Sequence, residues 1–205
     1  AAVPDSQRKA VVNSCVWLPE AAGVCGPMPI ACVLAGQPSE PKVRAKMFDV
    51  LLRNGLDVNA RTNGHETCVS LCCSHGDVDL ESVQLLLRCE ADPNLMCGDG
   101  HWNALFRVCA GLPKSLGTLR VLMTDATNKL RVNVLGGSHK VPPVRYVLDF
   151  HCDQHPDKVV EALELLQDAG MSTPAGIAAF YTRKMLDQRY GAKKQHARIA
   201  ELLMS

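Results

Sequence analysis

A pattern of paired apolar residues followed by a turn recurs along this chain of 205 residues. It occurs at residues 50–55, 85–90, 121–126 and 165–170, and the first two intervals are 35 and 36 residues whereas the third is 44. A period of this size is typical of proteins built from stacked supersecondary units, each of which needs a neighbour to bury its apolar face. The repeat therefore constrains the fold more than any single motif, and the third interval requires an insertion.

The stretches between these segments also recur. In residues 57–59 and 92–94 an Asp and an Asn flank one other residue, and these side chains can close turns on their own backbone. We therefore expect loops there, with the Asp and Asn shaping turns rather than contacting a partner. A Gly-containing entry and a short apolar helix follow at 63–73 and 99–109. The predicted unit is helix, turn, helix, loop.

These residues resemble the ankyrin repeat, whose pattern contains a Thr-Pro-Leu-His corner and a Gly-Ala-Asp-Val-Asn exit. Five segments are similar to the corner: residues 28–30, 67–70, 103–106, 142–145 and 173–176. Residues 55–59 and 90–94 are similar to the exit, and residues 74–77 resemble the turn between the two helices of the second copy. The resemblance is strongest from Val50 to Val108.

The resemblance implies an all-α, ankyrin-type helical repeat solenoid of about five repeats with long irregular loops. The whole chain would form one domain. Its expected parts are an N-terminal cap at residues 1–25, repeats at 26–180 and C-terminal capping helices at 181–205. Residues 4–16, charged first and apolar later, fit a capping helix.

The corners have a physical basis, because Thr can cap a helix and Pro fits the first helical turn, where a backbone donor would lack a partner anyway. Thr173 followed by Pro174 is the clearest instance. Pro38 and Pro41 are expected to start the second helix of the first copy, and Pro156 that of the fourth.

Ten cysteines raise the question of disulfides or zinc. No Cys-x-x-Cys pair occurs, and neither a secretory signal nor an Asn-x-Ser/Thr acceptor is recognisable, so we expect free thiols in a reducing, intracellular compartment, in the cytoplasm. Aligned with the repeat, five cysteines fall where helices pack and should act as small apolar residues: Cys32, Cys68, Cys72, Cys73 and Cys109. Cys89 and Cys97 flank a predicted loop and are expected to be exposed.

Two groups of side chains define an alternative, a zinc- or thiol-dependent function. Their members are Cys68, Cys72 and His75, and His151, Cys152 and His155. Each group supplies at most three ligands, at a spacing that matches no common zinc signature. The chain also lacks a phosphate-binding loop, a dinucleotide fingerprint and a nucleophile elbow. We therefore predict no catalytic residues, no metal, no cofactor and no small-molecule substrate.

The resemblance implies a non-catalytic protein–protein interaction module, a scaffold or adaptor, whose concave face of loop tips and inner helices holds a partner protein. Carried over by position, the partner-binding residues are Arg61, Asn63, His65, Glu66, Ser74, His75, Met96, Asp99, His101 and Trp102. Trp102 has two interpretations: a binding hot spot, or a ring that folds back onto Phe106.

Charge nearly cancels over the chain, at +1, but it is unevenly distributed. Residues 77–99 sum to −5, and residues 181–205 sum to +4. The basic end is interpreted as a polar cap rather than a nucleic-acid site at 183–198. Residues 77–99, which we call the acidic middle, could bind a basic arm of a partner. The uncharged residues 21–37 contain two prolines and are too few to span a bilayer, so we expect no membrane insertion.

Overall fold

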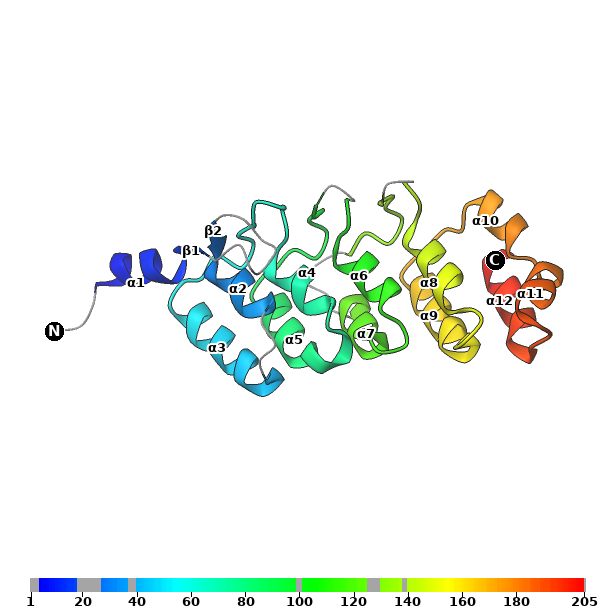
Figure 1. Cartoon of the computed structure of the whole chain (residues 1–205), viewed down its shortest axis with the longest axis horizontal. Coiled ribbons are helices and arrows are strands. Elements are labelled where there is room, and N and C mark those ends of the chain that lie inside the picture. The colour runs from blue at the N-terminus through cyan, green and yellow to red at the C-terminus, as the bar shows by residue number, and fades with distance from the viewer. Residues whose placement is uncertain are drawn as a thin grey trace.

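A computed structural model describes residues 4–17, 27–36, 40–98, 101–124, 130–137 and 140–204, and in these ranges the chain is mainly helical. The helices form antiparallel pairs that follow one another in an elongated row (Figure 1). One helix of each pair we call inner: α2 (Ile30–Gly36), α4 (Cys68–Cys73), α6 (Ala104–Ala110), α8 (Pro143–His151) and α10 (Ala175–Phe180). The others we call outer: α3 (Pro41–Arg53), α5 (Leu80–Arg88), α7 (Leu116–Thr124), α9 (Pro156–Asp168) and α12 (Lys194–Met204).

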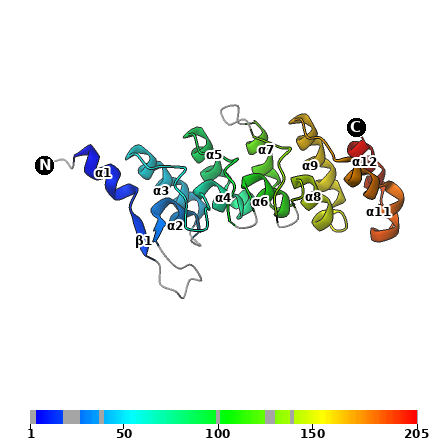
Figure 2. The ribbon, with the colours of Figure 1, turned by 90° about the horizontal axis from the view of Figure 1, so that it is seen from above.

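The two sets of helices pack as two parallel layers (Figure 2). Inner helices α2, α4, α6 and α8 each contact the next, as do outer helices α3, α5, α7, α9 and α12. The described ranges also contain α1 (Asp5–Val12) at the N-terminal end, the 3₁₀ helix η2 (Gly76–Asp79) before α5, and α11 (Arg183–Tyr190) before α12. None of the described helices is both long and apolar enough to cross a membrane.

The starts of the helices follow the corner chemistry only in part. Thr67 and Asn103 cap α4 and α6, since their side-chain oxygens accept hydrogen bonds from Ser70 N (3.3 Å) and Phe106 N (3.2 Å). The expected cap by Thr173 is wrong, because Pro174 itself is the N-cap of α10 and Thr173 lies one residue too early.

The prolines expected to start outer helices are confirmed where the structure describes them. Pro41 and Pro156 occupy the first positions of α3 and α9. Pro38 lies outside the described residues.

Segments closed by antiparallel backbone pairing precede the inner helices α2, α4, α6 and α8, and we call them fingers. Finger 1 is closed by antiparallel pairing of β1 (Cys15–Trp17) with β2 (Pro27–Pro29), which the sequence did not predict. Single bridges close finger 2 (Arg61–Thr67), finger 3 (Cys97–Trp102) and finger 4 (Gly136–Val141). His65, His101 and Lys140, each two residues before its corner, all have positive φ (60°, 48° and 48°), so these three fingers share a left-handed residue at the same place.

The Asp and Asn of the exit segments shape turns, as expected. Asp57 Oδ1 accepts a hydrogen bond from Asn59 N and Asp92 Oδ1 accepts one from Asn94 N, both at 2.9 Å. Asn59 also joins neighbouring units: its Oδ1 accepts from Asp92 N (2.8 Å) and its Nδ2 donates to Glu90 O (3.2 Å). These asparagines therefore hold the ends of successive outer helices in register.

The same link recurs at both ends of the row. Asn133 Oδ1 accepts from Ser172 N (2.8 Å) while its Nδ2 donates to Gly170 O (2.9 Å). Asn13, directly after α1, accepts from Asp57 N (2.6 Å) and donates to Gly55 O (2.9 Å). Residues 13–15 therefore occupy the place that an exit segment takes in later units.

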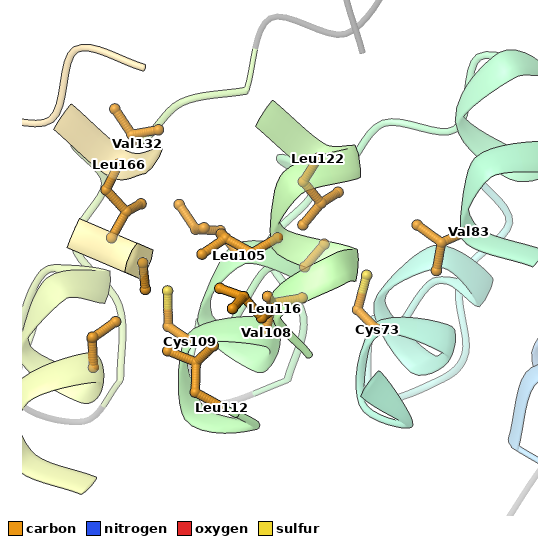
Figure 3. Close-up of a cluster of buried hydrophobic side chains, with 14 of the residues drawn as sticks. Cys73, Val83, Leu105, Val108, Cys109, Leu112, Leu116, Leu122, Val132 and Leu166 are labelled. Atoms are coloured by element: carbon orange, nitrogen blue, oxygen red, sulfur yellow. The ribbon is translucent and has the colours of Figure 1, made fainter. Parts of the chain in front are cut away.

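The core runs along the row between the two layers, and cysteines contribute to it (Figure 3). All five cysteines predicted to be buried are buried. Cys109, for example, lies among Leu105, Val108 and Leu112 in the close-up (Figure 3). The predicted exposure of Cys97 is wrong: it is buried at the base of finger 3, where its N–H donates to Trp102 O (2.6 Å). Cys89 is half-buried.

Candidate functional site

The residues predicted to contact a partner lie in two places. Arg61, Asn63 and His65 are exposed on finger 2 and His101 is exposed on finger 3, which is joined to finger 2 by the hydrogen bond from Gly98 N to Gly64 O (2.7 Å). Met96, just before finger 3, is half-buried, and Asp99 lies outside the described residues. The predicted residues of the two loops are therefore brought together.

Ser74 and His75 lie apart from the fingers, beyond the last residue of α4. The imidazole of His75 is held there, because its Nδ1 is 2.6 Å from Asp79 Oδ2 and that carboxylate also pairs with Arg44. The side chain of His75 thus takes part in the contact between the first two helix pairs.

Glu66 is half-buried, and its carboxylate forms an ion pair with Arg107 of α6. That pair links finger 2 to the next inner helix. Because the charge of Glu66 is already compensated by Arg107, the predicted role of Glu66 as a contact residue loses its main polar basis.

Trp102 folds back toward its own unit and toward the next one. Its ring centroid lies 6.2 Å from that of Phe106 and 4.9 Å from that of Tyr146, the latter in an edge-to-face arrangement. Tyr146 in turn stacks on Phe150 at 5.8 Å. Trp102 is half-buried in this cluster, which extends onto α8.

Tyr146 and Phe150 are not among the residues predicted to contact a partner. A signal was present, because two of the chain's few aromatic residues stand four positions apart on one predicted helix and so share one of its faces. Phe150 is 62% exposed, an unusual position for so large an apolar side chain.

A groove of about 340 Å³ runs beside this face of α8, lined by Val141, Arg145, Tyr146, Asp149 and Phe150. Arg145 Nε donates to Asp149 Oδ2 at 2.5 Å, and the guanidinium lies over the rings of Phe180 (5.3 Å) and Tyr181 (5.4 Å). The polar wall of the groove is thus fixed in place.

Tyr181 is the buried support of that wall. Its hydroxyl donates a hydrogen bond to Asp149. Burial, and next the hydrogen bond to Asp149, raise the pKa of the Tyr181 phenol, so the group stays a proton donor near neutral pH. The same carboxylate raises the pKa of Arg145 by its hydrogen bond.

The described residues of the fingers expose mainly basic side chains. Arg61 and His65 on finger 2, His101 on finger 3 and Lys140 on finger 4 are all exposed, and within the described ranges none of them is ion-paired. The nearby carboxylate of Glu66 is neutralised by Arg107. The described part of the finger surface therefore carries an excess of basic groups.

Three of the six acidic residues in the acidic middle expected from the sequence are taken up by internal contacts. The carboxylate of Asp77 accepts hydrogen bonds from Gly117 N (2.9 Å) and Thr118 N (2.7 Å) at the start of α7. Asp79 is buried against Arg44, and Asp92 closes its own turn. A sum of charges along residues 77–99 therefore overstates the negative charge that a partner would meet.

The basic C-terminal end is also partly compensated. Arg198 pairs with Glu164 of α9 at 3.0 Å and with Glu201 at 3.1 Å. Lys193 pairs with Asp153 at 3.2 Å. These pairs join the last helices to the preceding unit.

The side chains of the first Cys/His group, Cys68, Cys72 and His75, make contacts within the protein. Cys68 and Cys72 are buried, and burial raises the pKa of both thiols well above the ordinary value. His75 faces Asp79. Across the described ranges no three His, Cys, Asp or Glu side chains are grouped so that they could hold a metal ion.

The second group lies at the end of α8. His151 Nε2 is 3.1 Å from Ala110 O, and burial lowers the pKa of its imidazole. Burial raises the pKa of the Cys152 thiol to about 12. A protonated, buried thiol is a poor nucleophile and a poor metal ligand.

A second groove, apolar and also about 340 Å³, lies on the first helix pair and is lined by Ile30, Leu34, Val43, Lys46, Met47, Val50 and Leu51. Val43, Met47 and Val50 are about half exposed there. Among the residues that line this groove, none is held in an ion pair as Arg145 is in the groove on α8.

Comparison of the chain with protein families and with curated proteins gives no significant match.

Proposed function

We propose that this chain is an ankyrin-type solenoid. Its support is the recurrence of one unit: an inner helix, an outer helix and a finger, with a positive φ at the same place in fingers 2, 3 and 4. The asparagine links between successive exit segments add a second periodic feature. Both agree with the sequence pattern, and stacked units of this kind expose an extended face suited to binding.

The function we propose is non-catalytic binding of a partner protein on the face formed by the fingers and inner helices, as a scaffold or adaptor. One observation carries it: Arg61, His65, His101 and Lys140 are exposed on three successive fingers, and none of them is ion-paired within the described residues, outside which Asp99 lies. Internal pairing satisfies many of the chain's other charges. The charges of Arg61 and Lys140, exposed on this face, favour a partner of complementary charge.

A reducing, intracellular compartment is part of this proposal. The nine cysteines that the structure describes all carry free thiols, and seven of them are buried. Burial keeps the thiols of Cys32 and Cys73 protonated and shielded, since it raises the pKa of each to about 12.

Affinity capture with mass spectrometry tests the binding face. The bait variant combines Arg61→Glu and His101→Glu, two exposed changes on adjacent fingers. The matched control combines Lys42→Glu and Arg88→Glu, two exposed cations on the outer helices α3 and α5. Proteins captured by the wild type and by the control should be lost from the finger variant.

Circular dichroism and a urea titration establish that both variants are folded. Partners retained equally by the finger variant and the control would show that the binding face lies elsewhere. Retention by the finger variant with loss from the control would place it on the outer helices.

A further inference from the structure

The groove on α8 adjoins the basic fingers. Val141, which lines it, is the last residue of finger 4 and follows Lys140 directly. Fingers 3 and 4 are packed together at their bases, because a Cβ added to Gly136 would lie 2.5 Å from His101 O. Lys140 and His101, both exposed, therefore belong to one surface with the groove.

The floor of the groove is aromatic and rigid. Tyr146 is held edge-on by Trp102 (4.9 Å) and by Phe106 (5.6 Å), and Phe150 stacks on Tyr146 with the ring planes 20° apart. Phe150 remains 62% exposed although the rings around it are packed. A preorganised aromatic surface of this kind gives binding energy to an apolar side chain with little loss of conformational entropy.

The two charged side chains in the wall of the groove, Arg145 and Asp149, neutralise each other. Arg145 is ion-paired with Asp149 and covered by the rings of Phe180 and Tyr181. A bound acidic group would therefore find its uncompensated partners outside the groove, on Lys140 and on the neighbouring fingers. Apolar contact and charge are thus separated, the first in the groove and the second above it.

We infer that the groove, together with the exposed Lys140 beside it, binds an acidic peptide segment of a partner protein, with one large apolar or aromatic side chain seated on Tyr146 and Phe150 and a carboxylate directed at Lys140. This inference rests on the proposed function and specifies the chemistry of the partner. It assigns the strongest contact to α8, whereas the sequence placed it on fingers 2 and 3.

Selection from a random 12-residue peptide library displayed on phage, with the full chain immobilised, tests the inference. Enriched peptides should carry net negative charge and a Trp, Phe, Tyr, Leu or Met. Synthetic copies of the enriched peptides are then titrated against variants by fluorescence anisotropy. Phe150→Ala and Lys140→Glu should each weaken binding by about tenfold or more.

Two changes of matching chemistry serve as controls. Met204→Ala removes an exposed apolar side chain (73% exposed) at the far end of the row, and Lys42→Glu inverts an exposed charge on α3. Both should leave the dissociation constant unchanged. Raising the salt concentration should weaken binding to the wild type and have a smaller effect on what remains in Lys140→Glu.

The outcomes separate this inference from the proposed function. Enriched peptides that are neutral or basic, or that bind Phe150→Ala and Lys140→Glu as tightly as the wild type, would overturn the inference. If such peptides lose affinity in the Arg61→Glu, His101→Glu variant, the binding face stands but its partner chemistry is different. Failure to enrich any peptide sequence also counts against a site for a linear acidic segment.

Discussion

At each end of the row an ion pair joins two successive helix pairs, but one of these ion pairs is buried and the other is exposed to solvent. At the junction of the first two pairs, the side chains of Arg44 and Asp79 are 4% and 0% exposed. At the junction of α9 and α12, the side chains of Arg198 and Glu164 are each 46% exposed. Because water screens an exposed pair but not a buried one, similar contacts should contribute very differently to stability.

The comparison also shows how a row of stacked helix pairs tolerates different polar contacts between the pairs. The junction between α5 and α7 uses neither arrangement, since Asp77 caps the next outer helix through Gly117 and Thr118. Each junction thus has its own polar contact, while the apolar core and the asparagine links continue along the row. The regular elements define the stacking, and the polar contacts differ from one junction to the next.

The largest effect is expected from Arg44→Met. This change leaves the buried carboxylate of Asp79 without its guanidinium, and breaking a buried pair from one side costs about 3–5 kcal/mol. Urea denaturation monitored by circular dichroism should show the loss. Arg53→Met, which breaks an exposed pair with Asp49 on the same helix, is the control and should change little.

A double variant makes this prediction sharper. Arg44→Met combined with Asp79→Leu removes both charges, so most of the stability lost in the single variant should return. If the double variant is as unstable as Arg44→Met, the loss arises from packing around Arg44, and the contrast between buried and exposed junctions does not explain it.

How much of this fold the sequence predicts depends on the range of the contact. Periodicity places apolar residues within one unit, so the helix pairs, the prolines that start α3 and α9 and the buried Cys72, Cys73 and Cys109 follow from it. Finger 1 was missed because its strands are only three residues long and show no alternating pattern that would mark them as strands.

The candidate surface was predicted less well, for a physical reason. The pair of Glu66 with Arg107 and the contact of Trp102 with Tyr146 join residues from different units, and these depend on how one unit is rotated on the next. Sequence position carries no information about that rotation. Exposure of Arg61, His65 and His101 was predictable because it follows from their place in a loop.

An intermediate effect is expected from Asp77→Ala at the α5–α7 junction. The carboxylate satisfies two backbone donors at the start of α7 and also accepts from the hydroxyl of Thr118 (3.0 Å), so its removal should cost about 0.5–2 kcal/mol, as for other helix caps. The urea midpoint measures the loss. Glu81→Ala, an exposed acid on α5, should not shift it; an equal shift in both variants would instead indicate a general effect of charge.

A smaller effect on stability is expected from replacing the threonine of a corner, and it should differ between Thr67 before α4 and Thr173 before α10. Thr67→Val keeps the shape of a buried side chain and removes the cap of α4, so it should cost about 1 kcal/mol. Thr173→Val changes a side chain that makes no cap at α10 and should leave the thermal midpoint of unfolding unchanged. Equal losses would mean that Thr173 contributes in a way that the geometry of α10 does not account for.

The smallest effect is expected from Arg198→Met at the C-terminal junction. Its guanidinium pairs with Glu164 and Glu201, but all three side chains are exposed, so solvent and salt screen the attraction. The urea midpoint should stay within the reproducibility of the measurement, and any difference between variant and wild type should vanish as salt is raised to about 1 M, where charges are screened beyond a few ångströms. The difference caused by Arg44→Met should persist at that salt concentration, because solvent ions do not reach a buried pair. A loss in Arg198→Met that matches Arg44→Met, or that survives high salt, would show that burial is not what distinguishes the two junctions.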